Sequence, residues 1–215
     1  MYLIGDIGNT DIKICLFDKN CKAVKKLILK TNLISNKYLA SNLNFLTKYS
    51  GKINIILFSS VVPPIYSVIR KFLKNKLKKK CIELKQLNLN KLVKIMVNKK
   101  QVGSDRISNA IGIINKKSNY IILDFGTATT FDVVIKDKYL GGVIAPGVNL
   151  SLKTLISKAS LIPPVNLSKI SKIVGTNTSS AVKSGFYWGY AGLIDNVIKL
   201  IIKQTNKPFK IILTG

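Results

Sequence analysis

Residues 120–135, YIILDFGTATTFDVVI, carry the clearest structural pattern in the sequence. An apolar run at 121–123 leads into Asp124 and a turn around Gly126. Beyond the turn, apolar residues occupy alternate positions at Phe131, Val133 and Ile135. An apolar run, a glycine turn and a period of two predict two strands joined as a hairpin.

The N-terminus carries a second version of this pattern in MYLIGDIGNTDIKICLFD, residues 1–18. Its apolar start leads into Asp6 and a turn at residues 8–10, followed by alternating Ile12, Ile14 and Leu16. Both segments read as apolar strand, Asp, any residue, Gly, then small hydroxyl or amide residues. The resemblance is a weak internal repeat with a long period, and it predicts two related halves.

The remaining segments alternate between strand and helix patterns. Residues 52–64 indicate a buried strand and turn, and 211–215 a final strand; helical spacing is found at 65–80, 102–117, 149–159 and 178–203. In 102–117, Ser104 and Asp105 fall at the helix start. This alternation predicts an α/β fold with halves at residues 1–115 and 116–215.

The composition excludes several classes of protein. The chain has 215 residues, 47% of them hydrophobic, which is enough for a folded core. It has no His, so catalytic triads and most zinc sites are excluded, and chemistry must rest on carboxylates, Lys, Arg, hydroxyls and bound metal. No apolar run is long enough for a membrane span, and the N-terminus lacks a secretory signal pattern. Three Cys without a CxxC motif favour the cytoplasm.

The net charge of +26 raises the possibility of a nucleic-acid partner. Almost all the cations are Lys, however, and Arg occurs only at positions 70 and 106. Proteins that read bases and phosphates favour the planar Arg fork. A compositional bias explains the charge better, and no specific nucleic acid is expected.

An Asp at a strand end before a Gly turn can hold a metal ion and present backbone N–H groups to a phosphate. One copy alone is also typical of an ordinary hairpin turn. The two copies, at Asp6 and Asp124, favour phosphate binding.

Asp105 and Arg106 have both a structural and a functional interpretation. Asp105 could be a first-turn acid that interacts with the helix dipole, and Arg106 a surface cation. Because Arg is so scarce here, its position beside an acid after Gly103 favours recognition of a carboxylate substrate.

Together these residues resemble type III pantothenate kinase across essentially the whole chain. The motifs that carry the resemblance are DIGNT at 6–10, SSVVPP at 59–64, GSDR at 103–106, DFGTATTFDVV at 124–134, YLGGVIAPG at 139–147, GTNT at 175–178 and SGFYWGYAGLID at 184–195.

The resemblance implies an actin-like fold, a homodimer, and ATP-dependent phosphorylation of pantothenate, the first step towards coenzyme A. It implies that Asp105 accepts the proton of the substrate hydroxyl, and that Asp124 holds a monovalent cation (K⁺ or NH₄⁺) while Mg²⁺ accompanies ATP. The implied ATP contacts are Asp6, Ile7, Gly8, Asn9, Thr10, Asp11, Ile12, Lys13 and Thr127. The implied pantothenate contacts are Met96, Gly103, Ser104, Asp105, Arg106 and Thr178, with Arg106 facing either the pantothenate carboxylate or a neighbouring acid.

The chain departs from the family pattern in two places. Met96 stands where the family usually has an aromatic residue, and it offers no phenolic hydroxyl. The sequence also ends at Gly215, where the family continues with a loop and a helix, so a truncated C-terminal half is expected. These departures motivate an alternative function, a degenerate, non-catalytic member of the same fold with a ligand-binding or transcription-accessory role.

Overall fold

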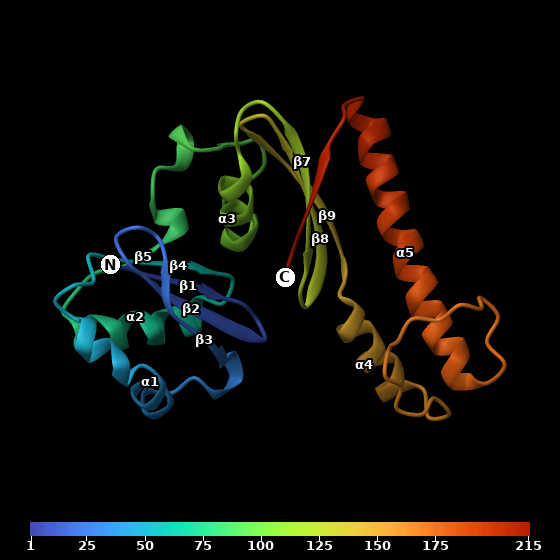
Figure 1. The fold of residues 1–215 in the computed structure, drawn as a ribbon, viewed down its shortest axis with the longest axis horizontal. Helices are drawn as coiled ribbons and strands as arrows, with labels where there is room; N and C mark the ends of the chain where they lie inside the picture. The colour runs from blue at the N-terminus through green and yellow to red at the C-terminus, as the bar shows by residue number, and fades with distance from the viewer. The chain divides into compact units, whose positions relative to one another are not determined.

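A computed structural model describes all 215 residues, and the chain divides into two compact units (Figure 1). The first comprises Met1–Lys94 and Asn98–Gly112, and the second Ile95–Val97 and Ile113–Gly215. Each unit contains one five-stranded mixed sheet. None of the helices has the length and apolar character needed to cross a membrane.

The first unit is built on a sheet with the strand order β3-β2-β1-β4-β5. Strands β1, β2 and β3 are antiparallel neighbours, whereas β4 and β5 run parallel to β1. The strands are β1 (Tyr2–Ile7), β2 (Asp11–Phe17), β3 (Ala23–Lys30), β4 (Ile55–Ser60) and β5 (Cys81–Glu83). The α-helices of this unit are α1 (Asn36–Asn42), α2 (Pro63–Leu77) and α3 (Ser104–Ile113).

The second unit has the strand order β10-β7-β8-β9-β6, in which the first four strands repeat the arrangement β4-β1-β2-β3 and the fifth, β6, is added at the opposite edge from β5. Its strands are β6 (Lys94–Ile95), β7 (Asn119–Phe125), β8 (Ala128–Ile135), β9 (Lys138–Pro146) and β10 (Lys210–Thr214). Its helices are α4 (Val148–Lys158) and the long α5 (Thr178–Thr205).

The two predicted hairpins occupy equivalent places in the two sheets. β1 lies between antiparallel β2 and parallel β4, and β7 lies between antiparallel β8 and parallel β10. Asp6 and Asp124 are each the next-to-last residue of their strand. The predicted duplication and the mixed α/β architecture are therefore confirmed.

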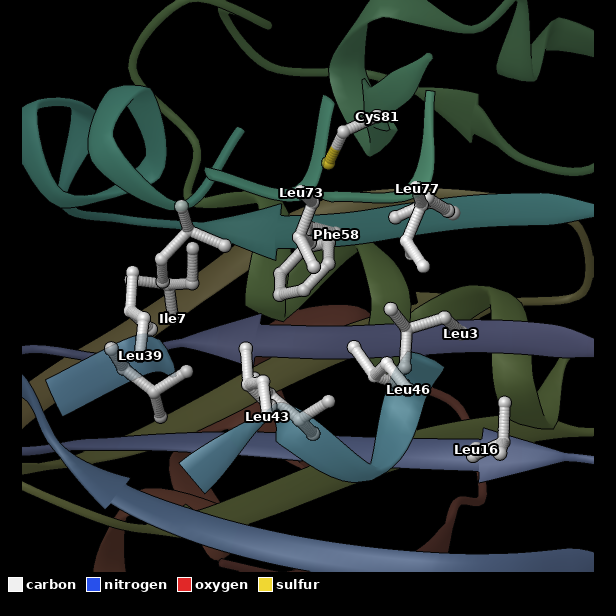
Figure 2. Close-up of a cluster of buried hydrophobic side chains, with 14 of the residues drawn as sticks. Leu3, Ile7, Leu16, Leu39, Leu43, Leu46, Phe58, Leu73, Leu77 and Cys81 are labelled. Carbon is white, nitrogen blue, oxygen red and sulfur yellow. The ribbon is translucent and has the colours of Figure 1, made fainter. Parts of the chain in front are cut away.

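The core of the first unit lies between its sheet and helices α1 and α2 (Figure 2). Leu3, Ile7 and Phe58 from the sheet are fully buried, as are Leu39 and Leu73 from the helices. A Cβ atom on Gly5 would lie 2.0 Å from the Phe58 ring, so only glycine allows the ring to pack against β1.

Helix α5 has defined ends and one packed face. The Asn177 side chain accepts a hydrogen bond from the Ser180 amide at its start, and Asn206 ends it in the left-handed conformation. Ile201 packs in the cluster that contains Ile121 and Phe131.

The three cysteines are free thiols, with Cys21 exposed and Cys81 buried. Burial raises the pKa of Cys81 to about 11, so its thiol stays neutral at physiological pH.

Candidate functional site

The first hairpin turn, residues 8–10, presents its backbone at the end of β1. The Gly8 amide donates to the Asp11 carbonyl at 3.0 Å and closes the turn. Asn9 and Thr10 are exposed at its tip. Lys13, which lies opposite Asp6 in the register of β1 and β2, is exposed as well. The turn thus combines a short exposed backbone with a cation, which is suited to an anion such as a phosphate.

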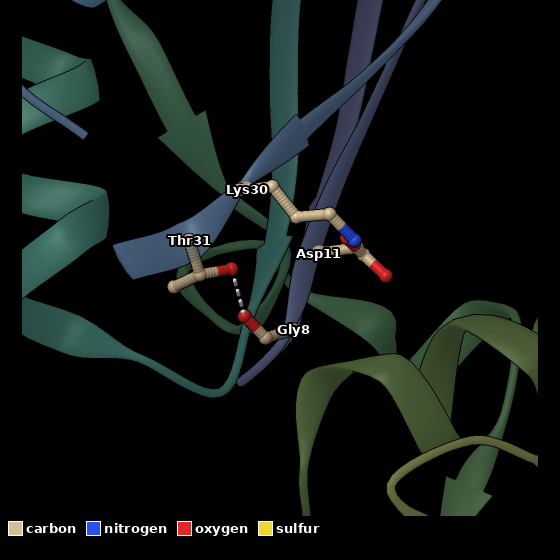
Figure 3. A network of polar contacts seen from close by, with 4 residues as sticks. All are labelled: Gly8, Asp11, Lys30 and Thr31. Carbon is tan, nitrogen blue, oxygen red and sulfur yellow. Dashed lines mark hydrogen bonds and ion pairs between the residues drawn. The ribbon is translucent and has the colours of Figure 1, made fainter. Parts of the chain in front are cut away.

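A brace that the sequence did not reveal holds this turn from the side (Figure 3). The Thr31 hydroxyl donates to the Gly8 carbonyl at 2.8 Å, and the Thr31 amide donates to the Thr10 carbonyl at 3.0 Å. Lys30 forms an ion pair with Asp11 at 2.7 Å. Both residues lie where β3 ends, in a segment for which no motif gave a signal.

The start of α3 lies at the end of the sheet where β1 and β4 terminate, which is also where the first hairpin turns. The Ser104 hydroxyl donates to the Ser60 carbonyl and accepts from the Ser60 amide, both at 2.8 Å. Ser60 pairs with Ile7, the last residue of β1. The structure therefore brings the predicted residues 6–13 and 103–106 together within one unit.

The Asp105 carboxylate is folded back against the residue that precedes the helix. Its Oδ1 accepts a hydrogen bond from the Arg106 amide at 2.8 Å. A Cβ atom on Gly103 would lie only 2.2 Å from the same Oδ1. Glycine at position 103 is thus required for this placement of the carboxylate, and Asp105 and Arg106 are both half-buried.

The second hairpin is held by a close backbone contact. The Gly147 amide donates to the Thr127 carbonyl at 3.0 Å, and a Cβ atom on Gly147 would lie 2.4 Å from the Gly126 carbonyl oxygen. The Tyr190 hydroxyl donates to the Pro146 carbonyl at 3.2 Å and shares a 2.6 Å hydrogen bond with Ser151. Helices α4 and α5 thus fix the loop that carries Thr127.

Asp124 is half-buried near the end of β7, one residue before Phe125. Its Oδ1 lies 3.9 Å from where a Cβ atom on Gly126 would be, so the carboxylate reaches under the turn. No group of three or more His, Cys, Asp or Glu forms a metal cage in this chain. A single carboxylate beside a glycine turn fits a cation that takes its other oxygens from backbone, water and phosphate.

A buried carboxylate that the sequence analysis did not single out lies further along β8. Asp132 is fully buried and accepts a 2.6 Å hydrogen bond from the Tyr139 hydroxyl. The sequence contains a sign of this contact, because an acidic residue within the apolar run FDVV is expected to be buried and to need a hydrogen-bond donor.

The two remaining predicted substrate contacts lie in the second unit. Met96 is 57% exposed, and its amide donates to the Tyr139 carbonyl at 2.9 Å. Thr178 is exposed at the first position of α5, directly after the capping Asn177.

Comparisons with known proteins agree on one family. A family model described as type III pantothenate kinase matches residues 2–200. The chain is 57% identical to a type III pantothenate kinase from Pelagibacter ubique over 100% of this chain and 87% of that protein. It is 36% identical to one from Desulfosudis oleivorans, again over 100% of this chain and 87% of that protein.

Two solved structures show the same fold at low sequence identity. A conserved putative Baf family transcriptional activator from Campylobacter jejuni has a TM-score of 0.54 at 21% identity, covering 91% of this chain and 78% of that one. A putative 2-dehydro-3-deoxygalactonokinase from Sinorhizobium meliloti has a TM-score of 0.54 at 9% identity, covering 99% and 94%. The predicted actin-like fold is confirmed by the two mixed-sheet halves and these neighbours.

Proposed function

Because the chain belongs to the type III pantothenate kinase family, we propose that it is an ATP-dependent kinase that phosphorylates pantothenate, the first step of coenzyme A biosynthesis. The observation that carries this proposal is the placement of residues 103–106 at the sheet edge that presents the first hairpin, in a chain 57% identical to a member of the family. The residues assigned as base and as phosphate loop thus belong to one compact unit.

The ATP phosphates are assigned to both hairpins. In the first unit, residues 6–13 offer the turn amides and the Lys13 ammonium, and in the second Thr127 offers its hydroxyl. Phosphoryl transfer passes through a loose transition state, so alignment and charge neutralisation supply most of the catalysis. Backbone donors on a braced turn suit this task because they need no reorganisation during the reaction.

Asp105 is assigned as the proton acceptor for the pantothenate hydroxyl. Its carboxylate accepts a hydrogen bond from the Arg106 amide, and it has room in this position because Gly103 has no side chain. A carboxylate of ordinary basicity suffices, because the hydroxyl loses its proton late in a loose transition state.

Pantothenate is assigned to Gly103, Ser104, Arg106, Thr178 and Met96. The Arg106 guanidinium has the planar donor geometry that suits either the pantothenate carboxylate or a neighbouring acid. Met96 supplies apolar contact, without the hydroxyl of the aromatic residue that is usual at this position.

We further assign Mg²⁺ to the ATP phosphates and a monovalent cation, K⁺ or NH₄⁺, to Asp124. Such ions neutralise the charge that develops on the transferred phosphoryl group. The half-buried Asp124 carboxylate under the Gly126 turn supports this assignment.

The proposal includes a homodimer that forms through α5. A shallow groove of about 270 Å³ runs along this helix and is lined by Leu155, Val182, Gly185, Phe186, Gly189, Tyr190 and Leu193. Trp188, 42% exposed, lies on the same helix, and only its i,i+3 spacing from Gly185 brings it next to the edge of the groove, outside the lining residues. A two-fold interface is self-complementary, so one helix can supply both the aromatic knob and the glycine groove. The occupant we assign to the groove is therefore α5 of a second copy.

Replacing Trp188 with Ser should weaken this dimer. An aromatic residue central to an interface commonly contributes 2 kcal/mol or more, so the dimer dissociation constant should rise at least about 30-fold. Light scattering coupled to size exclusion would report the change in mass. Leu161→Ser, which replaces an apolar residue 90% exposed outside the helix, should leave the dimer intact. A monomeric parent chain, or an unaltered dimer in the Trp188 variant, would contradict the assignment.

Three broader assignments complete the proposal. The halves 1–115 and 116–215 correspond to the two actin-like domains, and the chain acts in the cytoplasm, where its free thiols would stay reduced. No specific nucleic acid is assigned, since the positive charge is spread over Lys residues along the whole chain.

An assay of ADP release tests the proposed function. Release should require pantothenate and Mg²⁺. It should fall when K⁺ is replaced by Na⁺, because the cation site proposed at Asp124 is assigned to K⁺ or NH₄⁺. ADP release that is indifferent to pantothenate would exclude pantothenate as the acceptor.

A further inference from the structure

Thr31 occupies a position from which it can control the shape of the first phosphate turn. It lies directly after β3, is 5% exposed, and makes two hydrogen bonds to the turn. Its hydroxyl donates a hydrogen bond to the Gly8 carbonyl, and its backbone amide donates one to the Thr10 carbonyl. Figure 3 shows the bond to Gly8. The two bonds bracket Asn9 at the tip.

The chemical problem at such a turn is that each peptide group carries both a donor and an acceptor. The N–H group attracts a phosphate, whereas the carbonyl oxygen carries partial negative charge and repels it. A turn that binds ATP must keep its carbonyls directed away from the anion. Thr31 binds both the Gly8 and the Thr10 carbonyl, so both are directed toward the residue that follows β3.

We propose that Thr31 is a positioning residue for the ATP phosphates, which it serves by holding the Gly8 carbonyl on the side of the turn away from the nucleotide. This inference rests on the proposed function, since it assumes that residues 8–10 receive phosphate. Gly8 has no side chain to restrain its peptide, so the Thr31 hydroxyl supplies the restraint from outside the loop.

The Thr31→Val variant isolates the hydroxyl. Valine has nearly the same shape and retains the backbone bond to Thr10, so only the bond to Gly8 is lost. A hydrogen bond of this kind contributes modestly, and its loss should weaken ATP binding by about 2- to 10-fold. Thr31→Ser keeps a hydroxyl and should restore most of the affinity.

Calorimetric titration of the full chain with ATP, without pantothenate, gives the affinity directly, and steady-state assays divide the effect between parameters. We expect a raised dissociation constant and KM for ATP in Thr31→Val, with an unchanged KM for pantothenate and recovery in Thr31→Ser. An unchanged ATP affinity in Thr31→Val, with or without a lower Tm, would overturn the inference while leaving the kinase assignment intact. Failure of the parent chain to bind ATP would overturn both.

Discussion

Replacing Asp105 with Asn should lower kcat by about 10²- to 10⁴-fold, the range that a positioned general base contributes. The amide oxygen of Asn can still accept the hydrogen bond that the Arg106 amide gives to Asp105. The substitution therefore removes the basic carboxylate and preserves the local geometry. Steady-state kinetics with saturating ATP and pantothenate would measure the loss.

Binding measurements separate this chemical effect from a general one. ATP affinity should change little in Asp105→Asn, because the phosphate turn is a separate segment of the same unit. Asp18→Asn serves as a matched control, since Asp18 accepts bonds from the Asn20 and Lys22 amides in a turn outside the site. Turnover in Asp105→Asn equal to that of the control would sink the proposed base.

Gly103→Ala should also be severely impaired, although it removes no polar group. The new Cβ atom would lie 2.2 Å from the Asp105 carboxylate oxygen, so the carboxylate must move. Because it is the end of a flexible side chain, the move disturbs the fold little but displaces the base. A displacement of about 1 Å in a reacting group can lower the rate roughly 10²-fold.

The same helix provides the control for this variant. Gly112 lies near the end of α3, and a Cβ atom there would meet nothing within 4 Å. Gly112→Ala should retain full activity, and thermal unfolding should show similar stability for both variants. A Gly103→Ala enzyme with normal kcat would show that the observed carboxylate position has no bearing on catalysis.

The sequence predicted the parts of the fold that have strong periodicity. Both hairpins, the helices α2 to α5 and the strand β10 were expected from apolar spacing and glycine turns. Strand β3 was not, because it is an edge strand whose AVKKLILK pattern buries only one residue. Edge strands with Lys on their surface give a weak hydrophobic signal.

The candidate site was predictable where its residues form motifs along the chain. Residues 6–13, 103–106 and Asp124 were named in advance, and the structure places the first two sets at one sheet edge. Thr31 was missed because its role comes from a contact 23 residues away from Gly8. Gly147 lies within the motif at residues 139–147, but only its close approach to the Gly126 carbonyl explains why a glycine is needed there.

Phosphorus NMR of the reaction mixture would follow the transfer of the phosphoryl group from ATP to pantothenate itself. With Mg²⁺ and K⁺ present, we predict a new phosphomonoester resonance that grows as the terminal ATP resonance declines, and that requires pantothenate. Binding of ATP and pantothenate without that resonance, or ATP decay to inorganic phosphate alone, would contradict the account and favour the non-catalytic alternative.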